Sequence, residues 1–130
     1  MEKTDADRIH QIVERAAALY PERVALQVHA NDCLRDRYTY ARLVECFKSG
    51  ATRLRAYGLQ PGDRVVLLAA NSPEWAIAYL AALSAAVTVV LLDPTLTGAE
   101  LVSLIRSADP RALRLALDAI AAHPNVGPFL

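Results

Sequence analysis

The chain has 130 residues, a length at which one domain can bury a core of ordinary size, so we expect residues 1–130 to form a single domain. Its 14 basic and 14 acidic residues balance, and this zero net charge gives no electrostatic reason to expect nucleic acid or an anionic membrane as a partner. The two cysteines lack a CxxC spacing and the N-terminus is charged, so we expect reduced thiols, no signal peptide and a cytoplasmic protein.

The N-terminal third predicts a helix followed by a β-hairpin. Residues 4–19 have the periodicity of an amphipathic helix, and Thr4 with Asp7 forms the pattern of a capping box. The predicted inward face of this helix consists of Ile9, Ile12, Val13, Ala16 and Tyr20. Over residues 24–30 apolar and polar side chains alternate, which is typical of a half-buried strand with Val24, Leu26, Val28 and Ala30 on one side. The turn residues Asn31 and Asp32 follow, so the segment up to Tyr38 is predicted to be the second arm of the hairpin.

A second helix is predicted between Thr39 and Gly58. Thr39 is a good N-cap residue, and Gly58 suits the position after the helix because glycine adopts positive φ without a Cβ penalty. The apolar residues at helical spacing are Tyr40, Leu43, Phe47, Ala51, Leu54 and Tyr57. Gly50 lies on the same face, and we interpret it as a point of close packing against a sheet rather than as a ligand contact.

The centre of the chain predicts a strand–helix–strand unit. Residues 65–70 (VVLLAA) and 87–92 (VTVVLL) are apolar runs without alternation, as expected for parallel strands that are covered on both faces. The Ala- and Leu-rich residues 74–86 predict the crossover helix between them. Pro61 and Gly62 predict a type II turn before the first strand, and either Asn71 or Ser72 can cap the helix.

The last third begins with a complete T-x-x-E capping box, Thr97 to Glu100, which predicts a helix with Leu101, Leu104 and Ile105 inward. Residues 111–117 are ambiguous, because their leucines alternate as in a strand whereas their composition favours a helix. Residues 118–122 are expected to add one helical turn. The whole pattern predicts an α/β fold: a parallel sheet flanked by helices, with an N-terminal β-hairpin.

Several stretches of the sequence resemble the N-terminal region of the adenylate-forming enzymes, the superfamily of acyl-CoA synthetases, aryl-CoA ligases, luciferases and peptide-synthetase adenylation domains. These stretches are residues 20–26 (YPERVAL), 38–43 (YTYARL), 58–65 (GLQPGDRV), 71–75 (NSPEW), 78–83 (AYLAAL), 89–94 (VVLLDP) and 96–109. The sequence departs from the family at Ala86, where glycine is usual, and at Leu91, where proline is usual. The resemblance implies the fold of the first subdomain of these enzymes, with a strand at residues 111–117.

The same resemblance implies a piece of an AMP-dependent ligase that, at full length, activates a carboxylic acid as an acyl-adenylate, for example in fatty acid metabolism, with ATP, Mg and CoA as cofactors. The family's phosphate loop, downstream acidic motifs and late catalytic lysine fall outside the matched region. We therefore expect this chain alone to have no catalytic, cofactor-binding or metal-binding residues and no activity. The sequence likewise lacks G-x-G-x-x-G, G-x-x-x-x-G-K-[ST] and G-x-S-x-G motifs. His10, His29 and His123 are far apart and are expected at the surface or at helix ends.

The candidate site residues are selected by their position in the predicted sheet. Open parallel sheets bind ligands beyond the carboxyl ends of their strands, which selects Asn71, Ser72 and Asp93 as a possible substrate-side edge. The alternative interpretation is that Asn71 or Ser72 caps a helix and that Asp93 closes a turn.

The crossover helix also predicts a partner. Its residues 75–83 contain no polar side chain, so one face is left without an obvious cover, and we expect Trp75, Tyr79 and Leu83 to contact the missing remainder of the enzyme or a second copy. Residues 75–92 lack charge, but their alanines and the flanking acids argue against a membrane span. Two other functions stay open: a stand-alone docking module, and a flavodoxin-like domain for a small ligand.

Overall fold

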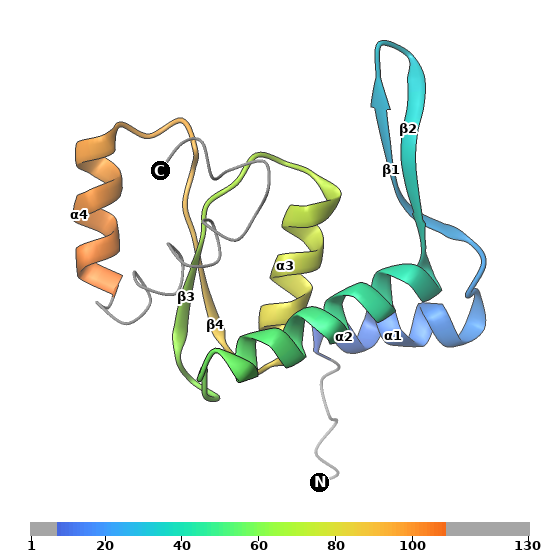
Figure 1. Cartoon of the computed structure of the whole chain (residues 1–130), viewed down its shortest axis with the longest axis horizontal. Helices are drawn as coiled ribbons and strands as arrows, with labels where there is room; N and C mark the ends of the chain where they lie inside the picture. The colour runs from blue at the N-terminus through green and yellow to red at the C-terminus, as the bar shows by residue number, and fades with distance from the viewer. Residues whose placement is uncertain (1–7, 109–130) are drawn as a thin grey trace, which may run out of the picture.

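A computed structural model of the chain describes residues 8–108 and has an α/β architecture (Figure 1). In chain order its elements are α1 (Ile9–Leu19), β1 (Val24–Ala30), β2 (Cys33–Thr39), α2 (Tyr40–Ala56), β3 (Arg64–Leu67), α3 (Pro73–Ser84), β4 (Thr88–Leu91) and α4 (Gly98–Ala108). β1 and β2 form an antiparallel hairpin, and β3 and β4 pair in parallel. The predicted hairpin and parallel pair are therefore confirmed. The predictions for Thr4 with Asp7, for residues 111–117 and for residues 118–122 lie outside the described residues.

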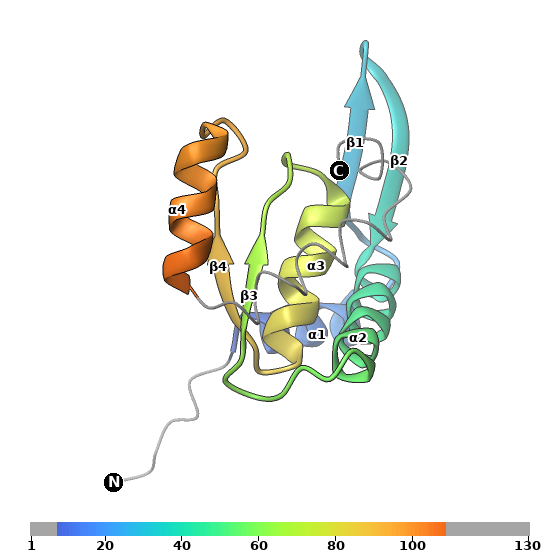
Figure 2. The same cartoon turned by 60° about the vertical axis from the view of Figure 1, so that its left-hand side comes forward.

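The β3–β4 pair lies between α3 on one face and α4 on the other (Figure 2). Val65 and Val89 pack with the cluster that includes α3, whereas Val66 and Val90 pack with Ile105 of α4. Because both faces are covered, neither strand needs alternating polar residues. Both strands are shorter than predicted, with four residues each. For β3, the reason is that the chain leaves the ladder to enter the cap of α3.

α2 and α3 pack against each other around a core formed by Leu43, Phe47, Leu80 and Ala81, in which Phe47 is fully buried. Gly50 lies at this crossing, because a Cβ atom placed on it would be 2.9 Å from the Cβ of Ala81. The predicted close packing at Gly50 is confirmed, but its neighbour is a helix. The expected neighbour, a sheet, was wrong because α3 lies between α2 and the β3–β4 pair (Figure 2).

Two of the predicted helix caps are present. The Thr39 hydroxyl accepts a hydrogen bond of 3.2 Å from the backbone N–H of Arg42 at the start of α2. At the start of α4, the backbone N–H of Thr97 donates to the Glu100 carboxylate at 2.9 Å, and the N–H of Glu100 donates to the Thr97 hydroxyl at 3.3 Å. These bonds satisfy backbone donors that a helix N-terminus leaves unpaired.

α2 and α3 end in the same way. After each C-cap, the first N–H donates to the carbonyl three residues earlier and the second to the carbonyl five residues earlier, which is a Schellman motif. The residue in the left-handed conformation is Gly58 at φ 93° after α2, as predicted, and Ala86 at φ 60° after α3. The second motif therefore places an alanine where a residue without Cβ would be unstrained.

The buried stripe of α1 differs from the predicted one. His10 is only 8% exposed, whereas Ile9, Ile12 and Tyr20 are exposed. The His10 ring therefore does not lie at the surface, and its Nδ1 has no hydrogen-bond partner among the described residues. Packing against α2 and α3 selects the buried stripe, and apolar periodicity alone could not. Four further residues predicted to point inward are exposed: Val24, Ala30, Tyr57 and Leu104.

Candidate functional site

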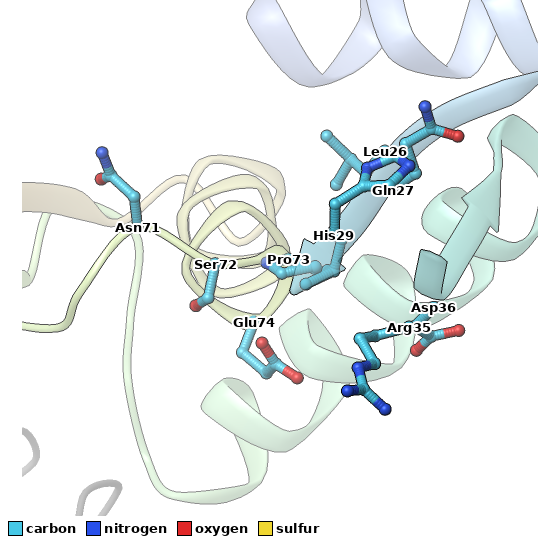
Figure 3. Close-up of a pocket in the computed structure, with 10 residues that line it drawn as sticks. Leu26, Gln27, His29, Arg35, Asp36, Asn71, Ser72, Pro73 and Glu74 are labelled. Atoms are coloured by element: carbon cyan, nitrogen blue, oxygen red, sulfur yellow. The ribbon is translucent and has the colours of Figure 1, made fainter. Parts of the chain in front are cut away.

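An open groove separates the β1–β2 hairpin from the first turn of α3, with a volume of about 580 Å³ (Figure 3). The hairpin contributes Leu26, Gln27, Val28, His29, Arg35 and Asp36, and the other wall consists of Asn71, Ser72, Pro73 and Glu74. Two of the three predicted site residues, Asn71 and Ser72, therefore line this groove.

The α3 wall is held by a helix cap. The Ser72 hydroxyl accepts a hydrogen bond of 3.2 Å from the backbone N–H of Trp75, so Ser72 rather than Asn71 is the N-cap. Pro73 occupies the first helical position, where its missing N–H costs nothing. Asn71 precedes the cap and is exposed. The alternative structural role of Ser72 is thus present, and Asn71 lines the groove with its side chain pointing away from the hairpin residues opposite (Figure 3).

The hairpin wall is held by Arg42 of α2. Its Nη1 donates to the Asp36 carboxylate at 3.1 Å and to the Arg37 carbonyl at 2.7 Å. The same guanidinium lies 3.9 Å from the centroid of the Tyr38 ring, a cation–π contact. The hydrogen bond from Arg42 lowers the pKa of Asp36, and burial raises the pKa of Tyr38. Asp36 is therefore ionised at neutral pH and already engaged by the chain itself.

Asp93 lies elsewhere. It follows β4 and is not among the residues that line the groove. Its carboxylate accepts hydrogen bonds from the backbone N–H of Thr95 at 2.9 Å and from the Thr95 hydroxyl at 2.8 Å. These bonds lower the pKa of Asp93. Asp93 thus closes the turn that leads toward α4, and the structure does not bring it together with Asn71 and Ser72 in this groove.

The sequence prediction missed the polar residues that the hairpin brings to the groove. Gln27, His29 and Arg35 come from strands that are remote in sequence from Glu74 on the opposite wall. No local motif predicts this approach, because it depends on the angle at which the hairpin leaves α2. Only the polar composition of residues 35–37 marked this part of the hairpin as unusual.

The groove has the chemistry of a binding surface. Leu26, Val28 and Pro73 give it an apolar floor, and the polar side chains of His29, Arg35 and Glu74 form its rim. Within residues 8–108, no three His, Cys, Asp or Glu side chains are grouped so that they could hold a metal ion. Across the same residues, no helix combines the length and the hydrophobicity that a membrane crossing requires.

Comparison with known proteins identifies the family. The family model of the AMP-binding enzymes matches residues 13–126. The chain is 32% identical over 110 residues to the oxalate–CoA ligase of Arabidopsis thaliana, covering 84% of this chain and 21% of that protein. It is also 32% identical over 105 residues to the mitochondrial medium-chain acyl-CoA ligase of Homo sapiens, covering 81% of this chain and 17% of that protein.

Solved structures agree. The O-succinylbenzoate coenzyme A synthetase of Bacillus subtilis, in complex with AMP, matches with a TM-score of 0.64 at 30% identity, over 75% of this chain and 24% of that one. The N-terminal subdomain of NpsA from Klebsiella oxytoca matches with a TM-score of 0.68 over 77% of this chain and 25% of that one; at 24% identity it supports the fold alone.

The chain thus spans about a fifth of the length of these curated relatives. The resemblance noted in the sequence is confirmed, and the family match argues against a flavodoxin-like domain whose likeness to these enzymes would be incidental. This chain belongs to the family of AMP-binding enzymes and corresponds to an N-terminal region of the adenylate-forming ligases.

Proposed function

We propose that the chain serves as the N-terminal subdomain of an acid–CoA ligase that activates a carboxylic acid as an acyl-adenylate and works in the cytoplasm. The observation that carries the proposal is the match of residues 13–126 to the AMP-binding enzymes. The names of two relatives, an oxalate–CoA ligase and a medium-chain acyl-CoA ligase, support a carboxylic acid substrate, with fatty acid metabolism as one setting.

In this proposal the subdomain is a scaffold, and the reacting groups come from other segments of the ligase. The cofactors of such an enzyme are ATP, Mg²⁺ and CoA. The residues of this chain do not fit them: the sequence has no glycine-rich phosphate loop, and residues 8–108 contain no group of side chains suited to a metal. The substrate-side edge formed by Asn71, Ser72 and Asp93 remains a proposal, in which Asn71 is the residue without a capping or turn-closing role.

The remainder of the ligase, or a second copy of the chain, would contact the outward face of α3. Trp75 and Tyr79 stack there with ring centroids 5.3 Å apart and an interplanar angle of 11°. Both rings and Leu83 are half-buried and belong to none of the three core clusters. On a helix that turns by about 100° per residue, these three residues share one side of α3, apart from Ile77, Leu80 and Ala81, which pack in the cluster with α2.

The test is acid-dependent exchange between ATP and pyrophosphate, measured with a panel of aliphatic and aromatic acids. The chain alone is expected to show no exchange above a denatured-protein blank. A chimaera in which this chain replaces the matched N-terminal region of the Bacillus subtilis O-succinylbenzoate synthetase is expected to retain exchange. Turnover by the chain alone would refute the scaffold role, and a folded but inactive chimaera would count against the proposed function.

A further inference from the structure

One edge of the hairpin has no partner. β1 pairs with β2 along one side only. Within the described residues, no backbone hydrogen bond joins Val24–Ala30 to any element other than β2. In an antiparallel pair, alternate residues of an outer strand direct their N–H and C=O groups away from the partner. β1 therefore presents a row of unpaired backbone groups, which is a template for a further strand.

The two outer edges of the hairpin differ in charge. β2 carries three consecutive charged residues, Arg35, Asp36 and Arg37. β1 (VALQVHA) contains no Asp, Glu, Lys or Arg. Charged side chains on an edge strand are a common protection against pairing with another chain. The outer edge of β2 is thus protected in this way, and that of β1 is not.

The groove runs along β1. Four consecutive residues, Leu26 to His29, line it, although the side chains of a strand alternate between its two faces. The groove therefore borders side chains from both faces of β1. The register shift between Val28 and His29 makes the strand locally irregular at this point. Leu26 and Val28 are half-buried, whereas Gln27 and His29 are exposed. The groove therefore offers an apolar and a polar side to alternate residues of an extended segment.

We propose that a short extended segment of the ligase polypeptide, from outside these 130 residues, lies in this groove and adds a strand to the open edge of β1. The inference rests on the proposed function. It commits to the ligase itself because the chain spans only 21% and 17% of the length of the two curated relatives, so most of such a protein lies elsewhere.

The groove also indicates what this segment would look like. About four residues at a rise of roughly 3.3 Å each match the length of strand that lines the groove. Apolar side chains would face Leu26 and Val28. Arg35 and Glu74 at the rim, which have no hydrogen bond or ion pair within residues 8–108, would face residues of opposite charge.

Amide hydrogen exchange, resolved residue by residue, tests the proposal. In the chain alone, the β1 amides that point away from β2 should exchange at least about tenfold faster than those bonded to β2. In the chimaera with the Bacillus subtilis synthetase, the outward amides should slow to the rate of the inward ones. Val28→Asp places a charge on the groove floor and should return the outward amides to fast exchange. Leu34→Asp, at an exposed position on β2 and outside the groove, is the matched control and should leave them slow.

Each outcome bears on one proposal. Equal protection of outward and inward amides in the chain alone, at low concentration, would overturn the inference, because the edge would already be covered. Protection that grows with chain concentration would also overturn it, in favour of a second copy. Fast outward amides in a chimaera that retains ATP–pyrophosphate exchange would overturn the inference and leave the proposed function intact. Slow outward amides in a chimaera without exchange activity would count against the proposed function alone.

Discussion

Ala86 shows how one residue can carry the strain of a turn. Its φ of 60° places it in the left-handed region, in the same position after α3 that Gly58 occupies after α2. The adjoining bonds are intact: the N–H of Gly62 donates to the Ala86 carbonyl at 3.0 Å and joins this turn to the one before β3. The turn that leads into β4 therefore requires the left-handed conformation at Ala86, although alanine is poorly suited to it.

Ala86→Gly is expected to stabilise the protein. The glycine removes the Cβ strain, about 1–2 kcal/mol, and adds a smaller entropic cost in the unfolded chain, so a net gain of roughly 0.5–1 kcal/mol is expected. The measurement is the free energy of unfolding from urea denaturation. Ala78→Gly, at an exposed position inside α3, is the control and should destabilise by about 1 kcal/mol. Equal effects of the two substitutions would contradict the argument.

Asp36 gives the hairpin a defined response to acid. Because the hydrogen bond from Arg42 lowers the pKa of Asp36 below 3.8 in the folded chain, this contact stabilises the fold fully above pH 3.8. The contribution is lost as the pH falls through the lower, folded-state pKa. Asp36→Asn should therefore reduce stability at pH 7 and have little effect at low pH.

Unfolding free energies measured from pH 7 downward would show the difference between wild type and Asp36→Asn closing only below about pH 4. Glu45→Gln provides the control, since Glu45 is an exposed carboxylate on α2 without an ion pair or hydrogen bond in the described part of the chain. A difference that is constant with pH would indicate that Asp36 acts through packing alone.

Among the elements, α2 and α3 depend on each other most closely. Gly50 allows the two helices to approach so near that an added Cβ would meet Ala81 at 2.9 Å. Backbone atoms of both helices would have to move to relieve such a contact, because neither methyl group can rotate away. The close packing of the two helices therefore requires glycine at position 50, although glycine is unfavourable inside a helix.

Gly50→Ala is expected to destabilise the protein by about 1–2 kcal/mol, because overpacking outweighs the gain in helix propensity. Gly98→Ala, at the first position of α4 with no atom within 4 Å of the added Cβ, should change stability little. Combining Gly50→Ala with Ala81→Gly in a double-mutant cycle should give a favourable coupling energy. Additive effects would show that the two positions do not touch.

The elements were largely predictable from sequence, because their signals are local. The unalternating runs, the cap at Thr39 and the box from Thr97 to Glu100 each act within a few residues. The buried face of α1 was not predictable, because His10 and Ile9 exchange places according to how α1 packs on α2 and α3. The predicted neighbour of Gly50, a sheet, was wrong for the same reason, because the layer that lies next to α2 is a property of the assembled fold.

For the whole molecule, the outward face of α3 is the feature that predicts association. Trp75, Tyr79 and Leu83 are half-buried apolar residues on one side of α3 that belong to no core cluster, and apolar patches on monomers are usually small unless they bind a partner. The candidate groove also depends on the arrangement of the whole molecule. Asn71 and Ser72 were predictable from the end of a strand, whereas the hairpin residues opposite them depended on long-range packing.

Leu83→Lys is expected to abolish self-association of the chain, because it places a charge on this face. Sedimentation velocity over a wide concentration range measures the change, and wild type should show a faster-sedimenting species as concentration rises. Ser49→Lys, at an exposed position on α2, should behave as wild type. A wild-type chain that stays monomeric at high concentration would contradict the prediction.

The placement of α4 has a consequence for the order in which the fold loosens. α4 contributes only the half-buried Ile105 to a core cluster of the described residues, while Val102 and Leu104 are exposed. By contrast, α2 and α3 share a core cluster around the fully buried Phe47. Local openings draw on the least buried elements first. The helix that covers one face of the parallel pair is therefore the element most ready to detach and reseat, while the α2–α3 unit remains the last cooperative unit to melt.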